Sequence, residues 1–142
     1  MSESVLLVDD EIDFLEAMSE RMTARGMKVT TASSAAEAIE IIEKSSFDAI
    51  ILDFQMPGMD GMEALKTIKA KRPESQIILL TGYATVEKGV EAMKIGATDF
   101  IEKPADLEAL SQKIKKAKAE KMLIAEKQQA DKVLEMIKKY GI

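Results

Sequence analysis

Short apolar runs recur along the chain, and each has the length of a buried strand. The runs "VLLV" at 5–8, "AIIL" at 49–52 and "IILL" at 77–80 lack the polar alternation of a half-exposed strand. Continuous runs of this kind are typical of strands that are covered on both faces of a parallel sheet. The stretch "MKVTTA" at 27–32 alternates more and is expected nearer a sheet edge, and "TDFIE" at 98–102 is a shorter candidate. The pattern therefore predicts five strands.

Apolar residues at helical spacing fill the gaps between these strands. We expect helices over 12–25, 35–44, 61–71 and 86–95. Suitable capping residues stand at their ends, with Ser34, Asp60 and Thr85 before helices and Gly26 and Gly96 after them. Strands that alternate with helices indicate an α/β fold, namely a doubly wound (βα)5 parallel sheet with right-handed crossovers.

The chain changes character after Pro104. From Ala105 to Tyr140 it contains neither Gly nor Pro, and helix-forming residues dominate. Two apolar stripes follow one another out of phase: Leu107, Leu110, Ile114 and Ala117, and then Ala119, Leu123, Ala130, Val133, Ile137 and Tyr140. We therefore expect one domain over 1–118 and a helical extension over 119–142 that either continues the fifth helix or bends back.

Three roles fit the extension over 119–142. It can be a dimerising helix or coiled coil, a linker to an effector domain, or a helix that caps the surface of its own domain. The heptad-like spacing covers only about 119–140, which is short for a coiled coil.

Composition narrows the possible chemistry. The chain has no Cys and no His, so disulfides, thiol catalysis and a phosphohistidine of its own are excluded. Residues 105–142 carry nine Lys and six acidic residues, a net charge of +3, whereas residues 1–104 carry eleven basic and nineteen acidic residues, a net charge of −8. An acidic body is a poor nucleic-acid binder and suits a cation better. We see neither a signal peptide nor a membrane span, and expect a cytoplasmic protein.

Polar residues follow the expected strands at their carboxyl ends. Asp9 and Asp10 come after the first strand, Asp53 after the third, Thr81 after the fourth and Lys103 after the fifth. Taken singly, each has an ordinary role as a helix cap, turn residue or solvated charge. With the strand order 2-1-3-4-5, however, the first and third strands flank the switch point at which such sheets bind ligands, so the three aspartates converge. Mg²⁺ resolves their mutual repulsion, and Thr81 and Lys103 can bind phosphoryl oxygens.

The motifs "VLLVDDE", "IILDFQMPGMDGMEAL", "IILLTGYA" and "GATDFIEKP" together resemble the receiver domain of two-component response regulators, over residues 4 to about 118. The last two motifs are most similar to receivers of enhancer-dependent transcription activators or hybrid kinases. The resemblance implies a flavodoxin-like fold and a phosphorelay function. It implies no enzyme activity beyond the chain's own phosphorylation and dephosphorylation.

The resemblance also implies roles for individual residues. Asp53 is the phosphoacceptor, and Asp10, Asp53 and the backbone carbonyl of Gln55 are expected to ligate Mg²⁺ directly, with Asp9 acting through a metal-bound water. Thr81 and Lys103 are expected to bind the phosphoryl group.

Further expectations concern the switch and the lifetime of the phosphorylated state. Phe100 takes the place of the family's switch aromatic, which is more often Tyr, and therefore lacks a hydroxyl. The Lys103–Pro104 peptide is expected to be cis. Tyr83, which the resemblance places beside the line of water attack, is expected to slow hydrolysis of the acyl phosphate.

The expected partners are a sensor histidine kinase or a phosphotransfer protein. Residues 86–118 and the C-terminal helix are the two candidate surfaces for a homodimer, and no membrane and no direct nucleic-acid contact are expected. Two other classes of protein are less consistent with the sequence. An aspartyl phosphatase usually carries a second Asp where this chain has Gln55, and a flavin protein needs a phosphate loop that is absent after the first strand. The closest alternative is a degenerate receiver that only binds partners.

Overall fold

The computed structural model describes residues 2–54, 56, 61–82 and 86–141, and all five expected strands and five helices are present in it. The strands are β1 (Ser4–Val8), β2 (Lys28–Ala32), β3 (Ala49–Asp53), β4 (Ile77–Thr81) and β5 (Asp99–Glu102). The helices are α1 (Ile12–Ala24), α2 (Ala35–Lys44), α3 (Gly61–Lys71), α4 (Val86–Ile95) and α5 (Leu107–Tyr140).

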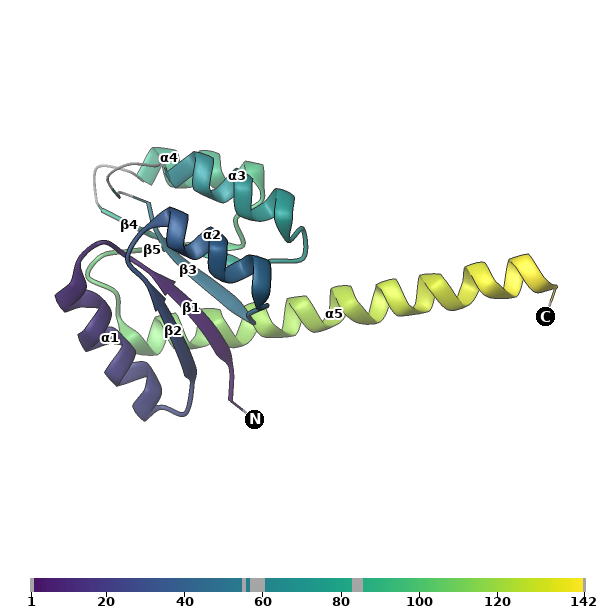
Figure 1. The fold of residues 1–142 in the computed structure, drawn as a ribbon, viewed down its shortest axis with the longest axis horizontal. Helices are drawn as coiled ribbons and strands as arrows, with labels where there is room; N and C mark the ends of the chain where they lie inside the picture. The colour runs from purple at the N-terminus through teal and green to yellow at the C-terminus, as the bar shows by residue number, and fades with distance from the viewer. Residues whose placement is uncertain (1, 55, 57–60, 83–85, 142) are drawn as a thin grey trace.

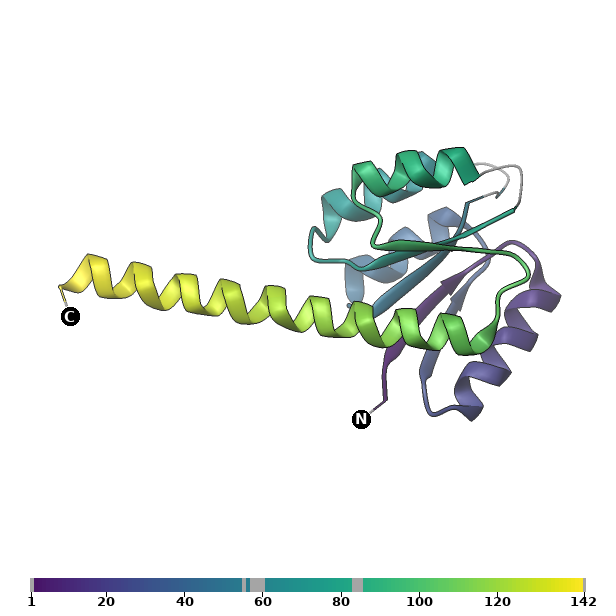
Figure 2. The same cartoon turned by 180° about the vertical axis from the view of Figure 1, so that it is seen from behind.

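The sheet has the predicted order β2-β1-β3-β4-β5, and every pair of neighbouring strands is parallel. Helices α2, α3 and α4 cover one face, and α1 and α5 cover the other (Figures 1 and 2). Strands β3 and β4 are buried at every position, whereas β2 is largely exposed. The alternation in the β2 sequence therefore reflects its place at the sheet edge. The flavodoxin-like fold is confirmed.

Alternate residues of the central strands supply two separate cores. Leu6, Leu52 and Leu79 belong to the core under α2, α3 and α4. Leu7 and Ile51 belong to the core under α1 and α5. Because both faces of the sheet are buried, the central strands need apolar residues at consecutive positions, which is the unbroken pattern seen in the sequence.

Most of the expected helix ends are confirmed. Ser34 accepts a hydrogen bond from the Glu37 backbone N–H, while the Glu37 carboxylate accepts from the Ser33 backbone and hydroxyl. Gly26 follows α1 with φ of +90°, and Gly96 follows α4 with φ of +133°, a region that favours glycine. The proposed caps Asp60 and Thr85 lie outside the described residues.

Helix α5 continues straight through the boundary between the two apolar stripes. It has 34 residues, which at 1.5 Å per residue gives about 50 Å. Leu110, Ile114 and Ala117 are buried against the sheet, and the remainder projects beyond the domain (Figure 1). The extension therefore continues the fifth helix and does not bend back onto its own domain. Among the described residues, no helix is both long and apolar enough to cross a membrane.

Candidate phosphoryl-acceptor site

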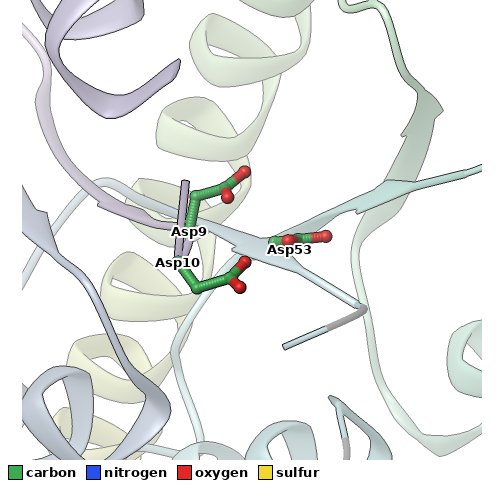
Figure 3. Close-up of side chains that lie close together, drawn as sticks. All are labelled: Asp9, Asp10 and Asp53. Atoms are coloured by element: carbon green, nitrogen blue, oxygen red, sulfur yellow. The ribbon is translucent and has the colours of Figure 1, made fainter. Parts of the chain in front are cut away.

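The ends of β1 and β3 place the three aspartates together. Val8 is paired with Leu52 in the sheet, so Asp9 and Asp53 follow neighbouring positions on adjacent strands. One carboxylate oxygen from each of Asp9, Asp10 and Asp53 lies within 4.8 Å of the others. Figure 3 shows the three side chains directed to the same side of the strand ends. The predicted convergence of the aspartates is confirmed.

Burial makes this cluster electrostatically costly. Asp9 is 0% exposed and Asp53 is 3% exposed, while Asp10 is more accessible. Carboxylates that share a site with little water repel one another, because each is deprived of the solvent that screens its charge. The Asp9 carboxylate is partly satisfied by the Glu11 backbone N–H, which donates to Oδ1 at 2.9 Å. The remaining charge needs a cation.

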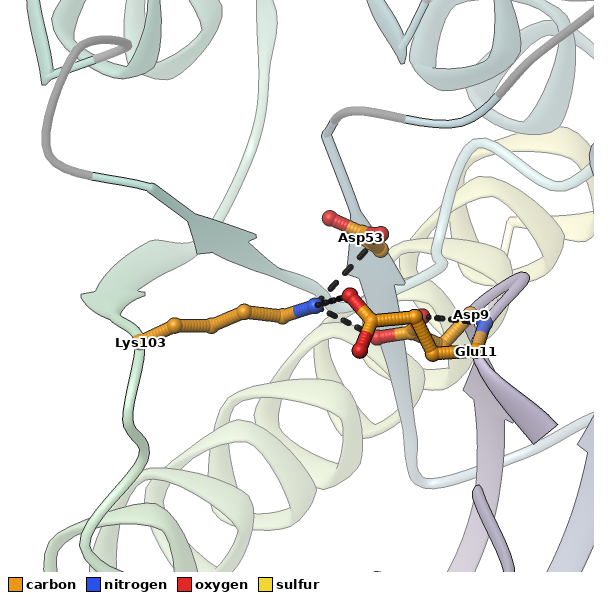
Figure 4. Close-up of polar contacts among 4 residues, drawn as sticks. All are labelled: Asp9, Glu11, Asp53 and Lys103. Atoms are coloured by element: carbon orange, nitrogen blue, oxygen red, sulfur yellow. Dashed lines mark hydrogen bonds and ion pairs between the residues drawn. The ribbon is translucent and has the colours of Figure 1, made fainter. Parts of the chain in front are cut away.

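Lys103 supplies one cation from the end of β5. Its Nζ lies 2.8 Å from Asp9 Oδ2, 3.6 Å from Asp53 Oδ2 and 3.6 Å from Glu11 Oε1 (Figure 4). Partial burial by itself lowers the pKa of Lys103, but the hydrogen bond to Asp9 and the charges of Asp53, Asp9 and Glu11 raise that pKa above its usual value. The ammonium is therefore held protonated, although one positive charge cannot neutralise three aspartates.

The backbone around Lys103 fixes its approach. The Lys103–Pro104 peptide is cis, as expected, and the Lys103 N–H donates to the Thr81 carbonyl at 2.8 Å. The Phe14 ring lies beneath the ammonium, with its centroid 4.8 Å from Nζ. An aromatic face attracts a cation, so Phe14 helps to hold the lysine over the pocket.

Thr81 ends β4 at the same edge of the sheet. Its side chain is fully buried, and its Oγ1 is the buried side-chain oxygen that finds no hydrogen-bond partner among the described residues. A buried hydroxyl without a partner is unfavourable, so such a group commonly indicates a missing ligand or water. The predicted phosphoryl-binding role gives this hydroxyl an acceptor.

Phe100 and Gly89 border Thr81. Phe100 is half-buried and packs against the core under α4. A methyl group built on Gly89 in α4 would lie 3.7 Å from Thr81 Cγ2 and 3.9 Å from the Phe100 ring, which are ordinary contacts. Thr81 and Phe100 therefore lie beneath the same point of α4.

Two residues expected at the site lie outside the part of the chain that the structure describes. Two contacts of Lys103 were not predicted from the sequence. Gln55, the expected backbone ligand, and Tyr83, expected beside the line of water attack, lie outside the described residues. Glu11 and Phe14 were not predicted to contact Lys103. Glu11 was visible as the third acid of "VLLVDDE", but the sequence gives no signal that Phe14 approaches a lysine 89 positions later.

The pocket fits a hard divalent cation. The donor set consists of carboxylate oxygens, the ligands that Mg²⁺ prefers, and the single ammonium leaves the aspartates with excess negative charge. The acidic triad, a lysine and an unpaired hydroxyl at the carboxyl edge of a parallel sheet define a candidate site for phosphoryl chemistry.

Comparison with known proteins identifies the family of the chain. The family model of the response regulator receiver domain matches residues 5–115. Transcriptional regulatory protein ZraR of Escherichia coli K12 is 36% identical over 115 residues, which cover 81% of this chain and 26% of ZraR. Photosynthetic apparatus regulatory protein RegA of Cereibacter sphaeroides is 37% identical over 103 residues, 72% of this chain and 56% of RegA. The chain thus spans about a quarter of ZraR and about half of RegA.

Solved structures show the same likeness. A receiver domain protein from Clostridium thermocellum superimposes with a TM-score of 0.83 at 34% identity, covering 86% of this chain and 98% of that one. A chain described as adenylate cyclase from Rhodopirellula baltica gives a TM-score of 0.87 at 30% identity, covering 93% and 98%. The chain belongs to the response regulator receiver domain family of two-component systems.

Proposed function

We propose that this chain accepts a phosphoryl group on Asp53 from a phosphohistidine of a sensor kinase or phosphotransfer protein. The observation that carries the proposal is the meeting of Asp53 with Asp9, Asp10 and Lys103 in one pocket. A degenerate receiver has no need for this costly arrangement of buried charge. Because the chain acts only on itself, it is not an enzyme in the sense of turning over a separate substrate.

The transfer is a nucleophilic displacement at phosphorus. A carboxylate oxygen of Asp53 forms the new P–O bond, the P–N bond to the donor histidine breaks, and its electron pair returns to the imidazole nitrogen. The product is an acyl phosphate. The reaction depends on positioning and charge neutralisation more than on acid–base catalysis, which is why the chain needs no histidine of its own.

Each residue of the pocket has a defined part in this proposal. Asp10 and Asp53 would hold Mg²⁺ directly, and Asp9 would hold it through a bound water. When bound, the ion neutralises charge that develops on the phosphoryl oxygens. Lys103 moves from Asp9 to a phosphoryl oxygen, and the Thr81 hydroxyl donates to another. Movement of Thr81 opens space beneath α4 into which Phe100 turns, and this transmits the change to the surface formed by α4, β5 and α5.

The test is phosphorylation of the full chain by acetyl phosphate with Mg²⁺, followed by intact-mass measurement. One added phosphoryl group is expected, and it is absent from Asp53→Asn and from reactions with excess chelator. The matched control is Asp13→Asn, which replaces an exposed carboxylate on α1 with a carboxamide. This variant is expected to accept the phosphoryl group normally on Asp53. Failure of the wild-type chain to form an adduct would favour the degenerate receiver.

The donor and the setting are also part of the proposal. A histidine kinase is the expected donor because the family works in two-component systems, and the exchange is placed in the cytoplasm. Transfer from a radiolabelled phosphohistidine protein to the wild-type chain, but not to Asp53→Asn, tests the donor class directly.

A further inference from the structure

Helix α4 carries a glycine in the middle of its inner face. Gly89 is buried, and Ala92 and Met93 follow it three and four positions later, on the face that packs on β4 and β5. Ala92 is fully buried, and Met93 packs against the same core. Position 89 is therefore one at which an apolar side chain would normally contribute to the core.

The conformation of α4 does not require glycine at this position. The φ of Gly89 is not positive. A Cβ built on Gly89 would meet nothing nearer than Thr81 Cγ2 at 3.7 Å, whereas a Cβ on Gly61 of α3 would lie 2.5 Å from the Phe54 carbonyl oxygen. Glycine inside a helix is less stable than alanine. Alanine at position 89 would therefore fit this conformation and stabilise it.

The space beneath Gly89 is bordered by two side chains of neighbouring strands. Thr81 Cγ2 on β4 and the Phe100 ring on β5 are the nearest atoms, at 3.7 Å and 3.9 Å from the built Cβ. Thr81 is fully buried, with an Oγ1 that finds no partner among the described residues, and Phe100 is only half-buried. The Phe100 ring therefore has apolar area left to bury, which favours an inward turn when space opens.

We propose that Gly89 keeps open the space that the Phe100 ring enters when Asp53 is phosphorylated, and thereby sets how strongly the switch responds. The inference rests on the phosphoryl chemistry proposed for Asp53. Movement of the Thr81 hydroxyl toward the phosphoryl group withdraws Cγ2 from α4, and the Phe100 ring fills the space between α4 and β4. A methyl group at position 89 would occupy part of that space.

The two positions of the Phe100 ring place different demands on residue 89. With the ring as the structure shows it, an alanine methyl group touches its neighbours without strain. With the ring turned inward, the same methyl group overfills a packed space, and strain of this kind shifts a two-state equilibrium by about tenfold or more. Glycine is therefore the less stable residue for the helix, but it leaves the second position of the ring accessible.

Fluorine NMR of the full chain tests the inference. The chain has four Phe residues, so incorporation of 4-fluorophenylalanine gives four signals, and Phe100→Leu identifies the signal of Phe100. With acetyl phosphate and Mg²⁺, the Phe100 signal of the wild-type chain is expected to shift. In Gly89→Ala it is expected to stay near its unphosphorylated position. Intact mass gives the phosphorylated fraction of each sample, and the signals are compared at equal fractions.

The matched control is Lys88→Ala, which introduces the same residue at the adjacent, exposed position of α4. Its Phe100 signal is expected to shift as in the wild-type chain. Without acetyl phosphate, Gly89→Ala is expected to melt about 2–4 °C higher than the wild-type chain, because alanine favours the helix and the methyl group fits.

Four results would overturn the inference. One is a lower melting temperature of Gly89→Ala, and another is a Phe100 shift in Gly89→Ala equal to that of the wild-type chain. Equal loss of the shift in Lys88→Ala would show that the effect does not depend on the space beneath position 89. A phosphorylated wild-type chain whose Phe100 signal stays in place refutes the role of Gly89 and leaves the chemistry of Asp53 standing, whereas a wild-type chain without an adduct refutes both.

Discussion

The carboxyl edge of the sheet and the projecting half of α5 both reverse the usual placement of residues, in opposite directions. At the sheet edge Asp9, Asp53 and Thr81 are buried, although such residues normally contact water. On α5 large apolar side chains are exposed, although they normally lie inside. Both features cost free energy in the isolated chain.

The two regions differ in what offsets this cost in free energy. At the sheet edge part of the offset is internal, because Lys103 crosses from β5 to the aspartates. On the projecting part of α5 the described residues contain nothing that covers the exposed apolar side chains. The first region is therefore an acidic pocket whose carboxylates suit a hard cation, whereas the second is a helix surface whose apolar side chains remain exposed.

The largest expected effect is a difference in the free energy of unfolding when the same substitution, Ile to Ala, is made in each half of α5. Ile114 is fully buried and Ile137 is 41% exposed. Ile114→Ala is expected to lower the free energy of unfolding by about 2–5 kcal/mol, because it leaves a cavity against the sheet. Ile137→Ala is expected to change it by less than about 0.5 kcal/mol in dilute monomer. Urea denaturation of both variants measures the difference, and equal losses would mean that the projecting half is packed after all.

Removal of the Lys103 ammonium should show how much the buried aspartates lower the stability of the folded chain. Lys103→Met is expected to lower the free energy of unfolding by about 3 kcal/mol in chelator, because Asp9 is left buried without its partner. Added Mg²⁺ should restore much of the loss. Lys113→Met removes a more exposed pair with Asp99, 2.7 Å apart, so it should cost less than about 1 kcal/mol and not respond to Mg²⁺. A similar response of the two variants would contradict the role of Lys103.

Magnesium should stabilise the folded chain through Asp10. At an ion concentration 100 times the dissociation constant, linkage predicts a gain of about 2.7 kcal/mol for the wild-type chain. Asp10→Asn is expected to lose most of that gain, whereas Asp13→Asn keeps it. Thermal melts with and without Mg²⁺ provide the measurement. A full magnesium response in Asp10→Asn would place the ion elsewhere.

Much of the fold could be predicted from the sequence because the apolar patterns of its strands and of its helices were both clear. The unbroken runs of β1, β3 and β4 indicated strands buried on both faces, and the alternation of β2 indicated an edge. The aspartates and Lys103 could be placed at one edge because parallel strands end together. The two apolar stripes of α5 were predicted to be out of phase, but their spacing left open whether the helix bends.

By itself the sequence determined the elements, the acidic edge of the sheet and the existence of a second apolar stripe, since these depend on residues that are near neighbours or on the rules of parallel sheets. Only the tertiary structure decided that Lys103 reaches Asp9, Asp53 and Glu11, that Phe14 lies under its ammonium, and that the second stripe stays uncovered. These facts depend on distances between segments far apart in the chain, and they are set by how the helices pack on the sheet.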